Sequence, residues 1–173
     1  SNMAGRGVAS ESIVVGEGHG YEYRAISDPT KLYPVVEPFG VSENHPTSGV
    51  SETTKTGSLV SAFIEGYYES RQVPIVGVSC SKGGTASSFW MPDGKPLNDA
   101  IARHNSAKDW LEENGYIIEH DYMVWLQGES DGGKEEVTSE LYASNLSAII
   151  EEMIAEAGIE FCAIIRIGHA KTN

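Results

Sequence analysis

From residue 57 onward, apolar side chains recur either at helical spacing or in short unbroken runs. Leu59, Phe63 and Tyr67 have helical spacing, and Pro74 separates them from the apolar run 75–78. Helical spacing is typical of a helix with one buried face, whereas a short unbroken run is typical of a strand buried on both faces. The pattern therefore predicts a helix followed by a buried strand.

The same two patterns alternate through the rest of the chain. They predict a second helix over residues 97–111, a strand over 116–126 that a polar segment interrupts, a third helix over 142–157 and a last strand over 161–167. Alternating helices and apolar strands are typical of a mainly parallel sheet with helices on both faces. The predicted fold is thus α/β, a doubly wound three-layer α/β/α sandwich of the flavodoxin-like type. In such folds ligands bind in the loops beyond the carboxyl ends of the strands.

Residues 5–56 have a different composition. They contain many Gly, Pro, Ser and Thr residues and little sustained periodicity, which predicts a large loop excursion. Tyr21, Tyr23, Tyr33 and Phe39 lie within it and have two interpretations. Aromatic rings stack on sugar rings, but they also anchor loops to a domain, and the second role is the more common one.

The length of 173 residues fits a single domain spanning 1–173, with a core large enough to need no disulfide or structural metal. The 25 acidic and 12 basic residues give a formal net charge of -13. Such a field repels nucleic acid and anionic membranes, so we expect neither as a partner and regard neutral substrates as the better fit. Without an apolar run of membrane-spanning length or a signal-peptide pattern, the sequence indicates a soluble protein of undetermined compartment, cytoplasmic or secreted.

Cys80 and Cys162 each lie in or beside a short apolar run. This placement predicts buried free thiols rather than a disulfide. Neither belongs to a Cys/His cluster with the spacing of a metal site, so we expect no structural zinc. Gly16, Gly18 and Gly20 lack the spacing and the helix context of a dinucleotide fingerprint, so we expect no nucleotide cofactor.

Three short segments carry residues suited to acyl transfer. Residues 1–7 read Ser-Asn-Met-Ala-Gly-Arg-Gly, residues 82–85 read Lys-Gly-Gly-Thr with Phe89 and Trp90 behind them, and residues 125–131 read Trp-Leu-Gln-Gly-Glu-Ser-Asp. In this order they resemble the sialate O-acetylesterase and acetylxylan esterase branch of the SGNH hydrolases. The pattern of that branch is G-Q-S-N-M-A-G-R-G, then G-G-T followed by W, then W-x-Q-G-E-S-D.

The resemblance implies a serine esterase that removes O-acetyl groups from carbohydrates, of the acetylxylan or sialate type, through an acetyl-serine intermediate. Ser1 would be the nucleophile, and its backbone N–H one oxyanion donor. The other donors would be a backbone N–H of Gly83 or Gly84 and the side-chain amide of Gln127. Acyl transfer needs such donors in place where the oxyanion forms, and glycine lets the backbone approach the ligand closely. Glu129 would orient the loop that carries the amide.

Asn2, Thr85 and Trp90 are candidates for binding the substrate, because they adjoin the nucleophile and the glycine-rich turn. Trp90 would wall the acyl or sugar pocket, although an aromatic residue beside such a turn is at least as often a packing residue. Asp131 would support the same loop as Glu129 or be a solvated structural residue. The mechanism needs no metal or cofactor, and the expected partner is an acetylated carbohydrate or another small acetyl ester.

The resemblance breaks at the catalytic base. The family's base is a histidine in a D-x-x-H motif near the C-terminus, and none of the five histidines here has an aspartate three residues before it. His104 falls on a predicted helix face and His120 at a predicted strand start, which favours structural roles for both. His169 follows the last predicted strand and is the one candidate base.

The resemblance also implies a domain that extends beyond both ends of the sequence. A buried first strand would precede Ser1 and the D-x-x-H segment would follow Asn173, so we expect the chain to be an internal portion of a longer protein. Ser-Asn is also a common remnant of a cleaved tag, and a true N-terminal Ser1 would carry its own α-amino group as base. A catalytically inactive carbohydrate-binding domain of the same fold is the alternative function that the missing base permits.

Overall fold

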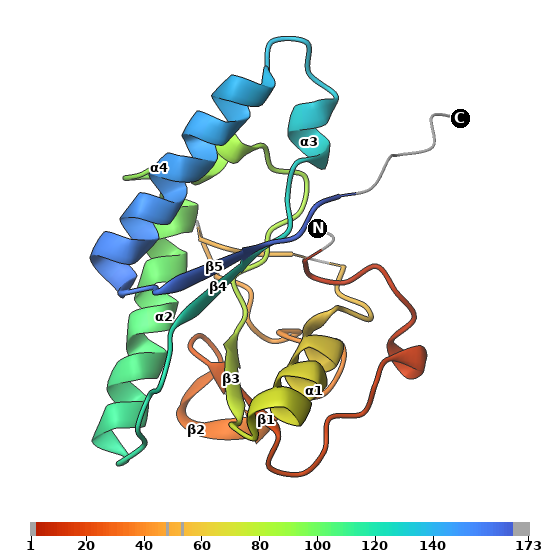
Figure 1. Cartoon of the computed structure of the whole chain (residues 1–173), viewed down its shortest axis with the longest axis vertical. Coiled ribbons are helices and arrows are strands. Elements are labelled where there is room, and N and C mark those ends of the chain that lie inside the picture. Colours follow the sequence, from red (N-terminus) through yellow and green to blue (C-terminus); the bar gives the residue numbers. More distant parts are fainter. Residues whose placement is uncertain (1–2, 48, 53, 168–173) are drawn as a thin grey trace.

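The computed structural model describes residues 3–47, 49–52 and 54–167. Figure 1 shows the arrangement of its elements. In chain order these are η1 (Ala9–Glu11), β1 (Gly20–Arg24), β2 (Asp28–Pro34), α1 (Val60–Arg71), β3 (Ile75–Val78), η2 (Ser87–Trp90), α2 (Lys95–Glu113), β4 (Tyr122–Trp125), α3 (Glu129–Gly132), α4 (Ser139–Ala157) and β5 (Phe161–Ile164). The mixed α/β character that the alternating pattern predicts is confirmed.

The three long helices α1, α2 and α4 lie where the apolar periodicity predicts them. Helix α4 follows the N-cap Thr138, whose side-chain oxygen accepts a hydrogen bond from the backbone N–H of Leu141. It ends at Gly158, which has a left-handed φ of 70°. Glycine adopts this conformation at little cost because it lacks a Cβ, so the helix stops there.

The strands form two sheets rather than the single doubly wound sheet that the pattern predicts. In the first, β1 pairs antiparallel with β2 and parallel with β3. In the second, β4 and β5 pair in parallel. Among the described residues β3 and β4 are not paired with each other, so the predicted three-layer sandwich around one sheet is not confirmed.

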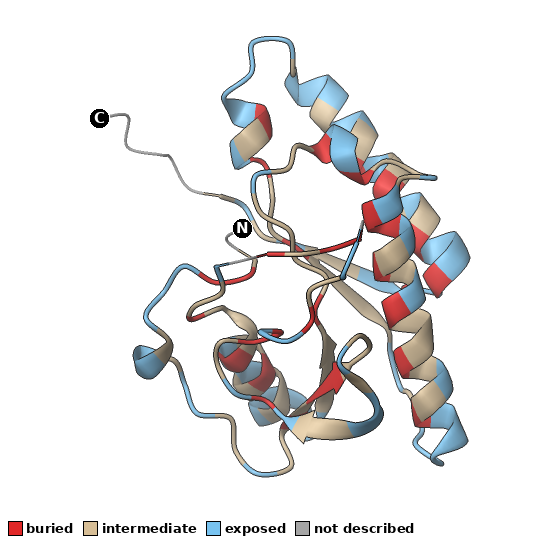
Figure 2. Cartoon of the chain, turned by 180° about the vertical axis from the view of Figure 1, so that it is seen from behind, coloured by how far each residue is buried: buried red, intermediate tan, exposed pale blue. Residues whose placement is uncertain are grey.

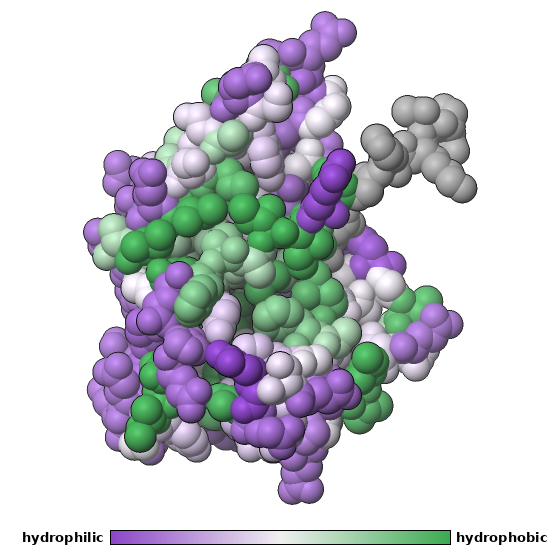
Figure 3. Space-filling view, in the orientation of Figure 1, coloured by the Kyte–Doolittle hydropathy of each residue, from purple (hydrophilic) through white to green (hydrophobic). Residues whose placement is uncertain are grey.

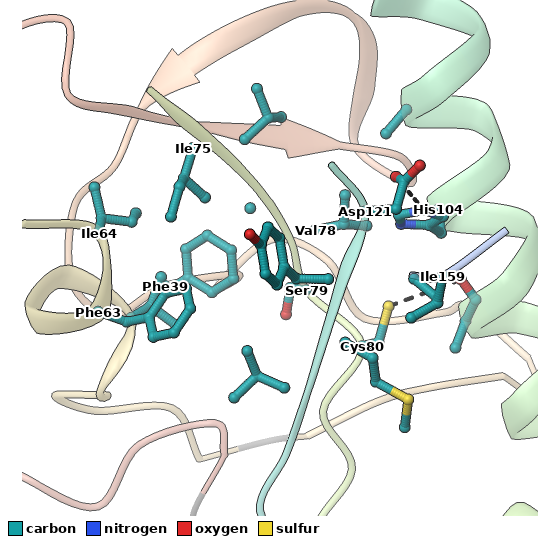
Figure 4. Close-up of a pocket in the computed structure, with 18 of the residues that line it drawn as sticks. Phe39, Phe63, Ile64, Ile75, Val78, Ser79, Cys80, His104, Asp121 and Ile159 are labelled. Atoms are coloured by element: carbon teal, nitrogen blue, oxygen red, sulfur yellow. Dashed lines mark hydrogen bonds and ion pairs between the residues drawn. The ribbon is translucent and has the colours of Figure 1, made fainter. Parts of the chain in front are cut away.

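A cavity of about 540 Å³ is lined by both sheets, and its wall includes every residue of β3 and of β4. Phe39, Phe63 and Ile64 add apolar side chains to this wall (Figure 4). The two strands therefore contribute to one cavity without forming a ladder with each other.

The predicted strand over 116–126 is wrong in its first half. Tyr116 donates its backbone N–H to the last turn of α2, and the side chain of Ile117 is 91% exposed. The carboxylate of Glu160 lies 3.0 Å from the ring Nδ1 of His120. These contacts replace strand pairing, so β4 begins only after the polar segment.

The prediction of one long loop over 5–56 is also wrong, because this region contains the hairpin β1–β2. Tyr23 is 1% exposed, and Phe39 is 8% exposed and packs with Ile64. A Cβ at Gly77 of β3 would lie 2.9 Å from the Phe39 ring, so glycine makes room for it. The two aromatic residues thus anchor the segment to the domain.

The main hydrophobic core lies where α2 and α4 face β4, and Figure 2 shows buried positions along the inner sides of both helices. Its buried members are Val50, Trp90, Leu97, Ala100, Trp125, Leu146, Ile149, Met153, Ala157 and Ile159. A smaller cluster of Val35, Phe39 and Ile64 packs with Ile75 of β3. Cys80 and Cys162 are free thiols, as predicted, but both are half-buried rather than buried.

Charged groups are buried where α2 meets the first sheet. Arg103 is 2% exposed, and its guanidinium donates to the carbonyl oxygens of Glu43, Ser79 and Val50 at 2.7, 3.0 and 3.2 Å. It also pairs with Asp99 at 2.9 Å. The carboxylate of Glu43 in turn accepts three hydrogen bonds from the turn between β1 and β2. The hairpin is therefore fastened to α2 by polar contacts.

Apolar side chains gather across the middle of one face of the molecule, over β4, β5 and α1 (Figure 3). Phe161 and Ile164 of β5 are among the large apolar side chains that are exposed. None of the helices in residues 3–47, 49–52 and 54–167 has the length and hydropathy needed to cross a membrane.

Candidate active site

Three segments that are far apart in the sequence meet at a small pocket of about 190 Å³. They are the same three segments whose motifs suggest acyl transfer. The lining residues are Arg6, Lys82, Gly84, Thr85, Leu126, Gln127, Glu129 and Ser130. Because residues 82–85 follow β3 and residues 126–130 follow β4, the pocket lies beyond the carboxyl ends of both strands, where α/β folds bind ligands.

The side chain of Gln127 contributes an amide whose two N–H groups both have partners. Nε2 donates to the backbone carbonyl of Thr85 at 3.0 Å and to the carboxylate of Asp131. Oε1 is the one buried side-chain nitrogen or oxygen without a hydrogen-bond partner among the described residues. The amide nitrogen therefore faces the glycine-rich turn.

The backbone of Gln127 is fixed from two sides. The Tyr142 hydroxyl donates to the Gln127 carbonyl at 2.8 Å and accepts the indole N–H of Trp125 at 3.1 Å. Burial raises the pKa of Tyr142, although its contact with Trp125 acts in the opposite direction. Gly128 has φ of 145°, and a Cβ there would lie 3.1 Å from the side chain of Ile167. Glycine is thus required where the chain turns from β4 into α3.

Asp131 supports the loop that carries Gln127. The interpretation of its carboxylate as solvated is wrong, because the residue is 3% exposed. The carboxylate accepts the backbone N–H of Ser87 at 2.8 Å and its hydroxyl at 2.7 Å. The Asn145 amide donates to the same hydroxyl at 3.0 Å. Ser87 and Asn145 could not be found from the sequence, since neither belongs to a motif and both lie far from residue 131 along the chain.

The glycine-rich turn reaches the pocket through Gly84 and Thr85, whereas Gly83 is not among the lining residues. Gly84 has a left-handed φ of 67°, and a Cβ there would have open space around it. Thr85 presents its carbonyl to Gln127, and its hydroxyl donates to the Lys82 carbonyl at 3.2 Å. The turn is therefore tied to the Gln127 loop through one shared hydrogen bond.

Trp90 lies beneath the turn rather than in the small pocket. It is 6% exposed, and its indole N–H donates to the Thr85 hydroxyl at 3.0 Å. Its ring packs edge to face against Trp125, with centroids 6.0 Å apart. In this structure Trp90 thus supports Thr85 and belongs to the hydrophobic core.

The rim of the pocket carries charges of both signs. Arg6 donates to the carbonyl of Thr54 at 2.7 Å and lies 3.7 Å from the carboxylate of Glu52. Lys82 lies in the glycine-rich turn 82–85, and Glu129 is exposed in the first turn of α3. Two cations thus border the site of a chain whose net charge is -13.

Three of the sequence candidates lie outside the described residues, namely Ser1, Asn2 and His169. The described histidines do not line the small pocket. His19 contacts Glu65 at 3.0 Å, and His120 contacts Glu160 at the same distance. Within the described ranges, no group of three or more His, Cys, Asp or Glu residues could hold a metal ion.

His104 forms a His–Asp pair that a search for D-x-x-H in the sequence cannot find. Its Nε2 lies 3.0 Å from Asp121, whose carboxylate also binds Lys108 at 2.8 Å. Burial lowers the pKa of His104, and Lys108 acts in the same direction against the opposing effect of Asp121. The pair borders the large cavity (Figure 4) and is not among the residues that line the small pocket where the motifs meet.

The pocket and its motifs agree with the class of protein that the sequence matches, which is the carbohydrate esterases. Residues 1–172 match the family described as sialic acid-specific acetylesterase, and the chain belongs to this family. No curated protein has a matching sequence. The fold is similar to the 1.6 Å X-ray structure of an Arabidopsis thaliana protein, with a TM-score of 0.66 and 19% identity over 94% of this chain and 68% of that chain. At this identity the similarity shows a shared fold alone.

Proposed function

We propose that the chain is a serine esterase that removes O-acetyl groups from carbohydrates. Membership of a carbohydrate esterase family supports the reaction class. The observation that carries the proposal is the meeting of Arg6, the turn 82–85 and the loop 126–130 in one pocket. Each segment belongs to a different motif, and acyl transfer needs a nucleophile and oxyanion donors in the same place.

In this proposal Ser1 attacks the acetyl carbonyl and its hydroxyl proton passes to a base. The negative charge that forms on the carbonyl oxygen is bound by the Ser1 backbone N–H, by an N–H of Gly84 or Gly83, and by the Gln127 amide. The sugar hydroxyl leaves with a proton, and water then releases acetate from the serine. The base is His169 or the histidine of the D-x-x-H segment that the resemblance implies.

Oxyanion binding would change one contact of the Gln127 amide. The N–H that donates to Thr85 would turn to the oxyanion, while the contact with Asp131 is retained. Thr85 lines the pocket beside the amide, which supports it as a substrate contact. Asn2 is proposed as a second substrate contact because it follows the nucleophile in the sequence. Trp90 would act on the substrate through Thr85, and Glu129 would border the entrance.

Gln127→Ala tests this assignment in an assay of a small acetyl ester. Loss of one oxyanion donor lowers kcat by about 10²- to 10³-fold, and KM should change little. Gln72→Ala is the matched control, because this exposed glutamine lies at the end of α1 and contacts Tyr68. Equal rates for the wild type and Gln127→Ala would contradict the oxyanion role.

A carbohydrate-binding domain without catalysis is the second candidate. It is favoured by the absence of histidine from the described lining of the pocket. Binding of an acetylated sugar without release of acetate would support it over the esterase.

A further inference from the structure

Among residues 3–47, 49–52 and 54–167, the hydrogen-bond partners of the Asp131 carboxylate are all donors. These donors are the backbone N–H of Ser87 at 3.1 and 2.8 Å from the two oxygens, its hydroxyl at 2.7 Å, and the amide of Gln127. Asp131 is 3% exposed and Ser87 is fully buried. A carboxylate held in this way is fixed in position and has little access to water as an alternative partner.

Two acceptors therefore determine which end of the Gln127 amide faces the turn. The Asp131 carboxylate and the Thr85 carbonyl both accept hydrogen bonds, so only Nε2 can lie between them. A rotated amide would lose both hydrogen bonds and bring Oε1 against two other oxygens. The unpartnered Oε1 is the cost of this orientation, because none of the described residues donates a hydrogen bond to it.

We propose that Asp131 is a positioning residue, which fixes the Gln127 amide with its nitrogen toward the glycine-rich turn. One N–H of the Gln127 amide keeps its hydrogen bond to the buried Asp131 carboxylate while the other N–H changes its partner. The other N–H, on the carbonyl of the pocket residue Thr85, is then the one directed at the substrate oxygen. The catalytic part of this inference rests on the proposed esterase function, whereas the orientation of the amide does not.

Asp131→Asn separates this role from simple packing. Asparagine has almost the same volume and its Oδ1 can still accept from Ser87. Its Nδ2 is a donor, however, and can pair with Oε1 of a rotated Gln127. Asn145→Ala is the control, since it removes a hydrogen bond from the same network without touching the carboxylate.

The first measurement is the side-chain NH₂ spectrum of the full chain labelled with ¹⁵N-glutamine, in which exposed Gln72 is an internal reference. In the wild type and in Asn145→Ala, we expect the NH₂ hydrogens of Gln127 to exchange with solvent about 10-fold more slowly than those of Gln72. In Asp131→Asn this protection should be lost and the Gln127 resonances should shift. The comparison within the wild type needs no variant, so it holds even if Asp131→Asn does not fold.

The second measurement is acetyl-ester hydrolysis by the same proteins. We expect kcat of Asp131→Asn to fall about 10²-fold with KM nearly unchanged, as for loss of an oxyanion donor. Exchange of Gln127 as fast as that of Gln72 in the wild type, or an Asp131→Asn spectrum like that of Asn145→Ala, would overturn the inference. If the spectra agree but the wild type hydrolyses no acetyl ester, the positioning role stands and the proposed esterase function fails.

Discussion

The half of the molecule built from α2, α4, β4 and β5 and the half built from β1, β2, β3 and α1 bury different kinds of side chain. The first half has a continuous apolar core that includes Trp90, Leu97, Trp125 and Ile149. The second has a small apolar cluster and a set of buried charged groups. Arg103 extends from α2 of the first half to carbonyl oxygens of the second. The halves therefore depend on different forces and should respond differently to the same kind of change.

Buried carboxylates distinguish the second half. Glu22 and Glu43 are each 2% exposed, and burial raises the pKa of Glu22 despite its contact with Arg24. Partial burial acts to raise the pKa of Glu37, but its hydrogen bonds from Ser58, the Phe39 backbone N–H and Ser61 together outweigh burial and lower the pKa. Desolvated charges contribute to stability only while their partners are in place. This half is thus expected to tolerate loss of a partner poorly.

The largest effect is expected where the two halves meet. Arg103→Met should lower the free energy of unfolding by about 3–5 kcal/mol, because the Asp99 carboxylate loses its buried partner and three carbonyl oxygens lose their donor. Urea denaturation measures this change. The double variant Arg103→Met/Asp99→Asn should recover part of the lost stability. If Arg103→Met alone cost less than about 1 kcal/mol, which is the value of an exposed ion pair, the distinction between the two halves would fail.

Within the apolar half, Leu97→Ala tests the core directly. Leu97 is 1% exposed, and the substitution should cost about 3 kcal/mol through lost burial and the cavity left behind. Leu141→Ala is the control in the same assay, since Leu141 is 45% exposed and should change stability by about 0.5 kcal/mol or less. Similar losses for both leucines would mean that α2 does not rely on this core.

A smaller effect is expected from pH at His104, which contacts Asp121 beside the large cavity. Its pKa is below the ordinary value of 6.5 in the folded chain, mainly because of burial. The unfolded chain therefore takes up the proton first, so stability is full above pH 6.5 and declines as the pH falls below it. In His104→Gln, the free energy of unfolding should depend less on pH between neutral and mildly acidic conditions. An unchanged slope would mean that other groups cause the pH dependence.

The smallest effect concerns a local contact that belongs to neither core. Thr138→Ala removes the N-cap of α4 and should cost about 1 kcal/mol. Ser147→Ala lies at an exposed position inside the same helix and should be neutral or slightly stabilising. Thermal unfolding of the two variants shows whether loss of the N-cap contact, rather than loss of a hydroxyl alone, lowers the stability.

The apolar half could be predicted from the sequence because burial of one helix face leaves a regular trace. Leu97, Ala100 and Leu111 mark the buried face of α2, and Gly158 marks the end of α4. The hairpin has no such regular pattern, because β2 is largely exposed and this half also buries the charged residues Glu22 and Glu43. Periodicity also says nothing of which strands pair, so the separation into two sheets could not be foreseen.

The candidate site, like the fold, could be predicted only in part from the sequence. The order of the three motifs predicted which segments meet, and the pocket lined by Arg6, Gly84 and Gln127 agrees with that expectation. A supporting role for Asp131 was one of the two expectations, but its partner Ser87 could not be predicted, because Ser87 belongs to no motif. Trp90 had two interpretations, a wall of the pocket or a packing residue. Its buried ring and the hydrogen bond from its indole N–H to the Thr85 hydroxyl agree with packing, and Trp90 also lines the large cavity.

Acetate release tests the central claim most directly. An O-acetylated sugar incubated with the full chain is followed by ¹H NMR, beside the Ser1→Ala variant and a fluorophosphonate-treated sample. The account predicts that the wild type forms free acetate, that Ser1→Ala forms none above background, and that the fluorophosphonate labels Ser1 and abolishes release. Acetate formed equally fast by Ser1→Ala, or sugar bound by the wild type without any acetate, would contradict it.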